Sequence, residues 1–449
     1  MKTMLSVQCG VRVPDYRVIA DRIAADIAAG RLKPGDRLPP QRRFARRHGI
    51  AGSTAARVYG ELVRRGVAVG EVGRGTFVRA ARPPDEPALA EPGGARVDLE
   101  LNFCVLPDQP ALLAPGLDRL VRDGLGDALT PIGVRGTAEA RDAVARMSAR
   151  GGWAPDPRRI LFTGNGRQAI AAAVSALVPV GGRLGVEAVT YPVVKAIATR
   201  LGVTLVPLPV DDAGVLPRAI RAADVRVVYL QPTLHNPLGT TMPERRRAEL
   251  ADTVRELDVQ VVEDGIYAFL GPDLPPLAPE RTTVVDSLSK RLAPGLTVGF
   301  AVPPEHLVDR VAAAARSGGW AAGHFAIAAA TGWLTDGTVQ SIVDRKRALA
   351  LERQQLVRDR LAGFDIRGDP GSYHCWWRLP ERWRAETFVA AAGRRGIAVT
   401  PAAAFAVVPG HAPNAVRLAL ASAPTPTLTA ALDVLAALAA GSPEDEPVD

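Results

Sequence analysis

The stretch V-V-D-S-L-S-K-R, residues 284–291, decides the fold of most of this chain together with V-V-E-D-G-I-Y, residues 261–267. Each stretch opens with a short β-branched run, as buried strands do. Polar side chains that can bind or react follow each run. Asp264 follows the first run, and Ser287 and Lys290 follow the second. A charged group beside an apolar strand is costly without a partner. The two stretches therefore predict buried strands whose carboxyl ends carry a site.

The same pattern of short apolar runs and helical stretches extends over residues 158–302. Such alternation predicts a largely parallel sheet covered by helices, with any ligand at the carboxyl ends of the strands. The predicted strands are residues 160–162, 184–186, 205–208, 225–230, 259–262, 284–286 and 297–302, and the helices between them include residues 168–178, 193–201 and 244–257.

Polar groups at these strand ends have both ordinary and chemical interpretations. Gly164, Asn165 and Gly166 follow a strand and open a helix, which suits a phosphate, although such turns are common. A loop lysine such as Lys290 is usually a solvated charge, but a buried amine there can form a Schiff base. Asp264 at a strand end is costly without a cationic partner, and its ordinary interpretation is a helix cap or a surface turn residue.

Taken together, the set is specific for one cofactor. Pyridoxal phosphate (PLP) needs a lysine for its aldehyde, an acid for its pyridinium nitrogen, a phosphate cup and an aromatic lid. Those parts occur here in chain order, as the loop 164–166, Tyr191, Asn236, Asp264 with Tyr267, and Lys290.

The order and sequence of these motifs resemble those of fold-type I aminotransferases. The resemblance extends from about residue 98 to near residue 440. The matching stretches are Y-P at 191–192, H-N-P-L-G at 235–239, E-D-G-I-Y at 263–267, S-L-S-K at 287–290 with A-P-G-L at 293–296, and R-L at 417–418. The resemblance implies an α/β PLP-dependent transferase fold of type I, with a largely parallel sheet and a smaller C-terminal α+β subdomain.

The resemblance also assigns a role to each matching residue. It implies that Lys290 forms the internal aldimine, that Asp264 pairs with the pyridinium nitrogen and that Tyr191 stacks on the ring. It further implies a carboxylate clamp at Arg417, although a packing salt bridge is the alternative for that residue. The remaining implied contacts are Asn236 and Tyr267 to the ring hydroxyl oxygen, and Gly164, Asn165, Gly166 and Ser287 to the phosphate.

Two positions depart from the family pattern. The family usually has an arginine for the phosphate seven residues after the lysine, where this chain has Thr297. Arg167 and Arg291 flank the predicted cup and are candidates to replace it. The family also often supplies a tyrosine from the partner subunit, and residues 129–132 offer none.

Positive charge is concentrated at the other end of the chain. Residues 1–80 contain 16 Lys and Arg against 6 Asp and Glu, a net charge of +10, whereas the other 369 residues contain 39 against 41. A basic head on a near-neutral body indicates a polyanionic partner such as DNA. Helical patterns at residues 16–29, 41–48 and 53–65, the last with Ser53 as its N-cap, precede a predicted hairpin of residues 67–69 and 76–78. This order predicts a winged helix-turn-helix.

The head resembles the GntR family of bacterial regulators in R-L-P-P-Q-R-R-F-A at 37–45 and G-R-G-T-F-V at 73–78. The residues expected to contact DNA lie on the second helix, the start of the third helix and the wing, although a single arginine is more often a solvated surface charge. The stretch that opens the third helix, A-G-S-T-A-A at 51–56, offers few bulky polar side chains, so we expect little direct readout of bases there. The predicted DNA-binding residues are Arg42, Arg43, Ser53, Thr54, Arg57, Gly73 and Arg74.

Residues 80–97 are rich in Pro, Gly, Ala and acidic side chains and are expected to link a DNA-binding domain, 1–79, to a PLP- and effector-binding domain, 98–449. This architecture resembles the MocR/GabR-type regulators. It implies a cytoplasmic, homodimeric transcription factor that binds a double-stranded DNA operator and senses PLP, an amine or an amino acid through an aldimine at Lys290.

Two other functions stay open. One is a working aminotransferase that carries a DNA-binding head, although we expect at most residual activity. The other is a cofactor-free dimerisation scaffold. No membrane span is expected, because no apolar run is long enough. No metal is expected, because Cys9, Cys104 and Cys375 are widely spaced and fit small buried side chains.

Overall fold

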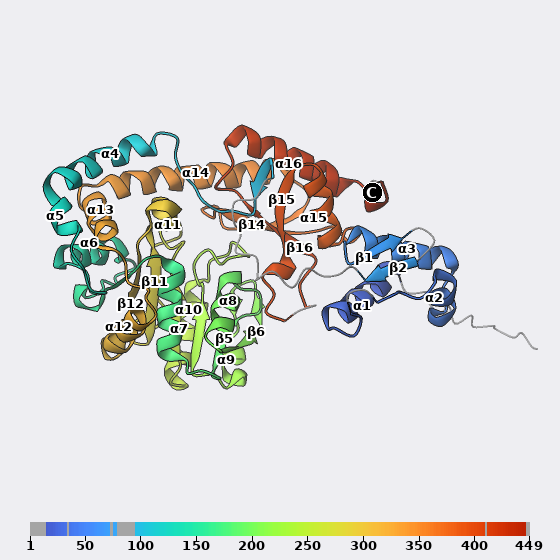
Figure 1. The fold of residues 1–449 in the computed structure, drawn as a ribbon, viewed down its shortest axis with the longest axis horizontal. Helices are drawn as coiled ribbons and strands as arrows, with labels where there is room; N and C mark the ends of the chain where they lie inside the picture. Colours follow the sequence, from blue (N-terminus) through green and yellow to red (C-terminus); the bar gives the residue numbers. More distant parts are fainter. Residues whose placement is uncertain (1–14, 34–35, 72–74, 79–94, 409–410, 446–449) are drawn as a thin grey trace, which may run out of the picture.

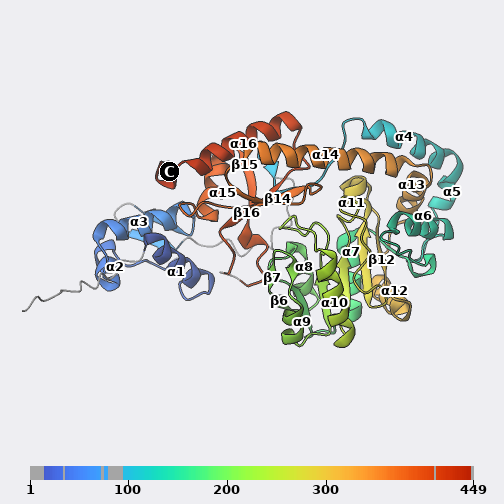
Figure 2. The ribbon, with the colours of Figure 1, turned by 180° about the vertical axis from the view of Figure 1, so that it is seen from behind.

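The computed structural model describes residues 15–33, 36–71, 75–78, 95–408 and 411–445. A small head packs at one end of an elongated body, and the body consists of a large domain and a small domain (Figures 1 and 2). The long helix α14, Thr338–Arg360, runs from the large domain into the small one.

The head is the predicted winged helix-turn-helix. Its elements are α1 (Tyr16–Ala28), α2 (Gln41–His48), α3 (Gly52–Arg64), β1 (Ala68–Glu71) and β2 (Gly75–Val78). The strands pair antiparallel, with Ala68 opposite Val78. Phe44 of α2 meets Tyr59 of α3 edge-on inside the small core, with 5.2 Å between ring centroids.

The prediction that Ser53 caps the third helix is wrong. The helix begins at Gly52 with Ala51 as its N-cap and no side-chain capping bond. Gly49 adopts φ 61° at the end of α2, which turns the chain, and Ile50 packs on the head core. After this turn α3 starts at Gly52, two residues before the start that an N-cap at Ser53 would give. Ser53 therefore lies exposed in the first turn of the helix.

A seven-stranded sheet forms the centre of the large domain, in the order β4-β12-β11-β10-β9-β5-β6. Its strands are parallel except β12, which is antiparallel to both of its neighbours. The strands are β4 (Leu161–Thr163), β5 (Arg183–Glu187), β6 (Thr204–Leu208), β9 (Val227–Leu230), β10 (Gln260–Asp264), β11 (Thr282–Ser287) and β12 (Gly299–Val302).

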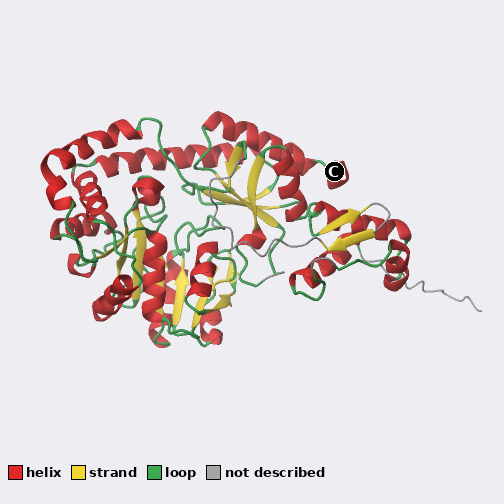
Figure 3. Ribbon diagram, viewed as in Figure 1, coloured by secondary structure: helices red, strands yellow, loops and turns green. Residues whose placement is uncertain are grey.

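Helices cover both faces of this sheet (Figure 3). Val227 and Tyr229 of β9 pack in one core cluster with α7, whereas Val228 and Leu230 pack in another with α10. The helices of the domain are α4 (Gln109–Arg119), α5 (Leu125–Ala128), α6 (Ala138–Ser148), α7 (Gly166–Leu177), α8 (Pro192–Arg200), α9 (Pro217–Ala223), α10 (Glu244–Glu256), α11 (Leu288–Arg291), α12 (Val308–Ser317) and α13 (His324–Thr335), with a π-helical turn at Leu120–Gly124 and a hairpin of β7 (Val210–Asp211) and β8 (Gly214–Val215).

The small domain is the expected α+β unit. Its sheet has the order β13-β14-β16-β15-β3, and β3 comes from the beginning of the body. Trp377, Trp383 and Phe388 are fully buried in its core. Its elements are β3 (Val97–Leu99), β13 (Asp365–Arg367), β14 (His374–Arg378), α15 (Ala385–Arg394), β15 (Ile397–Pro401), β16 (Ala415–Ala419) and α16 (Thr425–Ala440).

Residues 79–94, most of the predicted linker, lie outside the described residues, and Val97 at its end already pairs with Ile397 in the small-domain sheet. No helix in the described ranges is both long and apolar enough to cross a membrane. Cys104 and Cys375 are free and buried, as expected for small apolar side chains.

Candidate functional site

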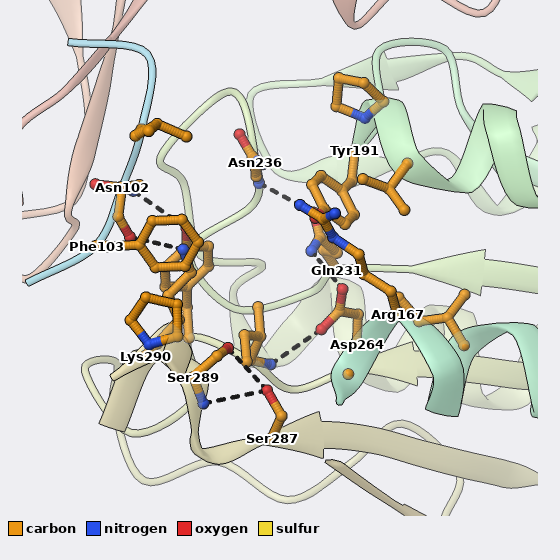
Figure 4. A pocket seen from close by; sticks show the side chains of 18 of the residues that line it. Asn102, Phe103, Arg167, Tyr191, Gln231, Asn236, Asp264, Ser287, Ser289 and Lys290 are labelled. Atoms are coloured by element: carbon orange, nitrogen blue, oxygen red, sulfur yellow. Dashed lines mark hydrogen bonds between the residues drawn. The ribbon is translucent and has the colours of Figure 1, made fainter. Parts of the chain in front are cut away.

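A cavity of about 570 Å³ opens at the carboxyl edge of the large sheet, where the small domain meets it. Figure 4 shows side chains from both domains converging on it. Eight of the nine predicted cofactor residues line this cavity, as does the predicted carboxylate clamp: Asn165, Gly166, Tyr191, Asn236, Asp264, Tyr267, Ser287, Lys290 and Arg417.

Gly164 is the predicted residue that does not line the cavity. Its backbone N–H donates to the carbonyl of Trp320 at 3.1 Å. The next residue, Asn165, accepts from the backbone N–H of Gln168 at 3.0 Å and so caps α7. Gly164 therefore turns the chain toward the helix, and the helix itself begins at Gly166.

Asp264 is the last residue of β10 and is buried. Its Oδ2 accepts from the Tyr229 hydroxyl at 2.6 Å and from Nε2 of Gln231 at 2.8 Å, and its Oδ1 accepts from the backbone N–H of Ile266 at 3.1 Å. Burial raises the pKa of Asp264 to about 6. A cationic N–H in the cavity would stabilise this carboxylate as an anion.

Lys290 lies on the short helix α11, directly after β11. Its Nζ donates to the carbonyl of Asn102 at 2.6 Å and lies 3.6 Å from the ring centroid of Phe103. Burial lowers the pKa of Lys290 well below its usual value, and the positive charge of Arg417 lowers it further. A lower pKa favours the neutral amine, which is the nucleophilic form of lysine.

Small polar groups line the part of the cavity next to α7. The hydroxyls of Ser287 and Ser289 lie 2.9 Å apart, and Ser287 is fully buried. Gly166 approaches this pair so closely that an added Cβ would lie 3.1 Å from the Ser287 hydroxyl. The absence of a side chain at Gly166 leaves room for an anion beside the N-terminus of α7, where the helix dipole favours it.

Arg417 projects from β16 and is buried, with 6% of its surface exposed. Its guanidinium donates to Oδ1 of Asn236 at 3.3 Å, to the hydroxyl of Thr400 at 3.0 Å and to the carbonyl of Glu100. No carboxylate of the described residues lies within ion-pair distance, and its Nε has no partner among them. The packing salt bridge considered from sequence is therefore not formed there, and the buried cation faces a cavity that can hold an anion.

The two predicted tyrosines occupy different walls of the cavity. The Tyr267 hydroxyl accepts from Nδ2 of Asn102 at 3.1 Å, and its ring packs against His374. Tyr191 lies beside Arg167 at the start of α8 (Figure 4), and burial raises the pKa of its phenol.

Several residues of the site carry no obvious sequence signal. Gln231 follows the strand next to Asp264, so a polar residue at a strand end was its only signal. Tyr229 is an interior residue of that strand and resembles a core side chain. Asn102 and Phe103 follow β3, far from Lys290 in sequence, and nothing local links them to it.

The predicted DNA-binding residues divide into three groups. Arg42 and Arg43 are exposed on α2, and Ser53 and Thr54 lie in the first turn of α3. Arg57 instead contacts the body, with 2.6 Å between its guanidinium and the carboxylate of Glu444. Gly73 and Arg74 lie outside the described residues. The described residues also contain no cluster of three or more His, Cys, Asp or Glu that could hold a metal.

Comparisons with known proteins agree with both parts of this architecture. The family of bacterial regulatory proteins named gntR matches residues 15–78, and the family named aminotransferase class I and II matches residues 128–435. The uncharacterized HTH-type transcriptional regulator YdeF of Bacillus subtilis is 28% identical over 92% of this chain and 91% of its own length. The HTH-type pyridoxine biosynthesis transcriptional regulator PdxR of Corynebacterium glutamicum is 25% identical over 76% of this chain and 78% of its own.

Among solved structures, the kynurenine aminotransferase of Pyrococcus horikoshii superposes with a TM-score of 0.70, covering 78% of this chain and 92% of that protein. At 21% identity this similarity establishes the fold alone. The body thus has the fold of PLP-dependent aminotransferases, as its cavity indicated. The chain belongs to the aminotransferase class I and II family, and its gntR-type head makes it a member of the MocR/GabR-type transcriptional regulators.

Proposed function

We propose that this protein binds operator DNA through its head and that a ligand in the body cavity controls this binding. The ligand pair is PLP together with an amine or amino acid. One observation carries the proposal: a lysine whose pKa is lowered by burial, a hydrogen-bonded buried carboxylate and a buried arginine that forms no ion pair among the described residues face one cavity. Buried groups of this kind cost stability, and they concentrate where a ligand uses them.

The donors in the cavity fit PLP. The cofactor, when bound, supplies an aldehyde carbon that condenses with amines and a ring that withdraws electrons. Lys290 presents an amine whose pKa is lowered by burial, and Asp264, held by Tyr229 and Gln231, presents a carboxylate to a ring N–H. Ser287, Ser289 and the start of α7 offer hydroxyl and backbone donors to a phosphate.

Arg417 defines the second ligand. Its buried guanidinium forms no ion pair with a carboxylate of the described residues, and its Nε has no hydrogen-bond partner among them, so an amino acid whose carboxylate reaches it gains a charge-assisted bond. A ligand that binds one arrangement of head and body more tightly than another shifts DNA affinity by that difference. We further propose a homodimer, because paired heads suit operators with two half-sites.

The direct test is the visible absorption spectrum of the purified protein with added PLP, compared with that of Lys290→Ala. We expect a Schiff-base band in the wild type that Lys290→Ala lacks. Arg417→Met should keep the band and weaken an amino acid's effect on the spectrum about a hundredfold, since removing one partner of a buried charge pair costs about 2–5 kcal/mol. A wild type without any band would leave a cofactor-free scaffold and overturn the proposal.

A working aminotransferase is the second candidate function. Lys290 for proton transfer, Asp264 for the ring nitrogen and Arg417 for the carboxylate are the groups that transamination needs, and all three line the cavity. Steady-state turnover with a panel of amino acids and 2-oxo acids distinguishes the two functions. Rapid turnover that is indifferent to DNA would favour the enzyme.

A further inference from the structure

The cup beside α7 contains neutral donors, yet a phosphate carries up to two negative charges. Thr297 stands at the position where an arginine was expected and lines the same cavity, and its buried hydroxyl has no hydrogen-bond partner among the described residues. Ser287 and Ser289 contribute hydroxyls only. If PLP binds here, a cation from another element has to balance the phosphate.

Arg291 is not free for this role. Its guanidinium lies 2.7 Å from Oδ2 of Asp286, and both side chains are buried. The guanidinium also packs over the ring of Phe269, 5.0 Å from its centroid. Arg291 does not line the cavity. Its charge is therefore used inside the protein, in a pair that would be costly to break.

Arg167 is differently placed. It is the second residue of α7, directly after Gly166, and it lines the cavity. Figure 4 shows its side chain beside Tyr191, and its positive charge lowers the pKa of the Tyr191 phenol, against the larger effect of burial, which raises it. Among the described residues it forms no ion pair with a carboxylate. Arg167 is thus an exposed side chain at the mouth of the cavity, one residue after the Gly166 that approaches Ser287, and it is not committed to a carboxylate among the described residues.

We propose that Arg167 is the phosphate-binding cation of this protein and takes over the task for which Thr297 is unsuited. This inference rests on the proposed function, because it assigns a residue to the same site. The cation has moved from the loop before β12 to the first turn of α7, where it adds to the helix dipole and to the Ser287 and Ser289 hydroxyls. A bidentate guanidinium suits a phosphate better than a lysine would.

The test compares PLP with pyridoxal, which has the same aldehyde and ring but no phosphate. Affinities are measured by titration of the absorption band. Loss of one charge-assisted hydrogen bond is worth about 1.5–3 kcal/mol, so Arg167→Gln should weaken PLP binding about 10- to 100-fold and leave pyridoxal binding unchanged. Inorganic phosphate should compete with pyridoxal phosphate in the wild type more strongly than in the variant.

Rescue gives the sharper result. Adding Thr297→Arg to Arg167→Gln should restore most of the PLP affinity, since the arginine then returns to the position that the family uses. Arg200→Gln, at the exposed end of α8 and away from the cavity, is the matched control and should change neither affinity. Thermal unfolding of each variant checks that the fold is intact.

The possible failures can be told apart. Equal losses for PLP and pyridoxal would mean that Arg167 only positions Tyr191, and they would overturn the inference. Unchanged PLP affinity in Arg167→Gln would overturn it as well while leaving the proposed function in place. A wild type that binds neither aldehyde would overturn the proposed function and this inference with it.

Discussion

The head and the body use arginine in opposite ways. On α2 of the head, Arg42, Arg43, Arg46 and Arg47 are exposed, and none forms an ion pair within the described residues. In the body, Arg417 is buried on β16 and held by oxygen atoms of Asn236, Thr400 and Glu100. Exposed charges cost little and act over a Debye length, whereas buried ones cost stability and act at close range.

The difference matches the two ligands that we propose. A DNA backbone is a long polyanion that many solvated cations can neutralise without exact placement. A small carboxylate or phosphate needs a few donors fixed in geometry and shielded from water. DNA binding by the head accordingly depends on its charge and on the order of its elements. Ligand binding by the body depends on the positions of individual side chains.

The largest effect should come from the arginines of α2. Replacing Arg42, Arg43, Arg46 and Arg47 together by alanine removes up to four cations that can neutralise DNA phosphates. We expect the slope of log affinity against log salt to fall by about 0.9 for each phosphate that is no longer neutralised, and affinity to drop on the order of a thousandfold at low salt. Fluorescence anisotropy with a labelled DNA duplex at several salt concentrations measures both quantities.

The same substitutions should leave the absorption band of bound PLP untouched, because α2 does not line the cavity. A variant with unchanged DNA affinity would place the DNA-binding surface elsewhere. A lower affinity with an unchanged slope of log affinity against log salt would contradict the view that these arginines neutralise phosphates.

The next effect tests the energetic cost of the buried site. Because burial raises the pKa of Asp264 to about 6 from 3.8, the folded state holds this proton more tightly than the unfolded state does. Below about pH 4 Asp264 is protonated in both states and does not lower the free energy of unfolding. As the pH rises to about 6, its ionisation lowers the free energy of unfolding progressively. At 1.36 kcal/mol per pKa unit the cost levels off at about 3 kcal/mol.

Denaturant unfolding of the cofactor-free protein should accordingly show Asp264→Asn to be about 3 kcal/mol more stable than wild type at pH 7 and equal to it near pH 4. Asp118→Asn, which changes an exposed carboxyl on α4, is the control and should show no such trend. An advantage independent of pH would mean that packing, and not the buried charge, sets the difference.

The sequence predicted the large domain better than the small one for a physical reason. The strands of the large sheet are short β-branched runs, and its helices follow directly in the chain, so local patterns determine them. The small sheet depends on pairing between distant segments, such as Val97 with Ile397. The strand predicted at residues 297–302 begins at Gly299, since Thr297 turns toward the cavity.

The candidate site divides in the same manner. Asp264, Ser287 and Lys290 end or follow strands, where a polar residue after an apolar run is visible in the sequence. Tyr229 and Asn102 could not be found, because the first looks like a core residue and the second reaches the site only through the fold. Likewise, the lack of an ion pair to Arg417 among the described residues depends on where acidic side chains lie in space.

The smallest effect concerns Arg57, the predicted DNA-binding residue that the body already engages. Its guanidinium lies 2.6 Å from Glu444, and both side chains are about half exposed, at 55% and 44%. Exposed ion pairs are worth about 0.2–1 kcal/mol. Glu444→Gln should therefore raise DNA affinity about two- to fivefold at low salt, and less at high salt, because it releases Arg57 for DNA.

Glu381→Gln, which changes an exposed acid elsewhere on the small domain, controls for the change in net charge. Equal gains from both variants would mean that Glu444 acts only through long-range charge, and a loss of affinity would mean that its contact with Arg57 holds the head in its DNA-binding position.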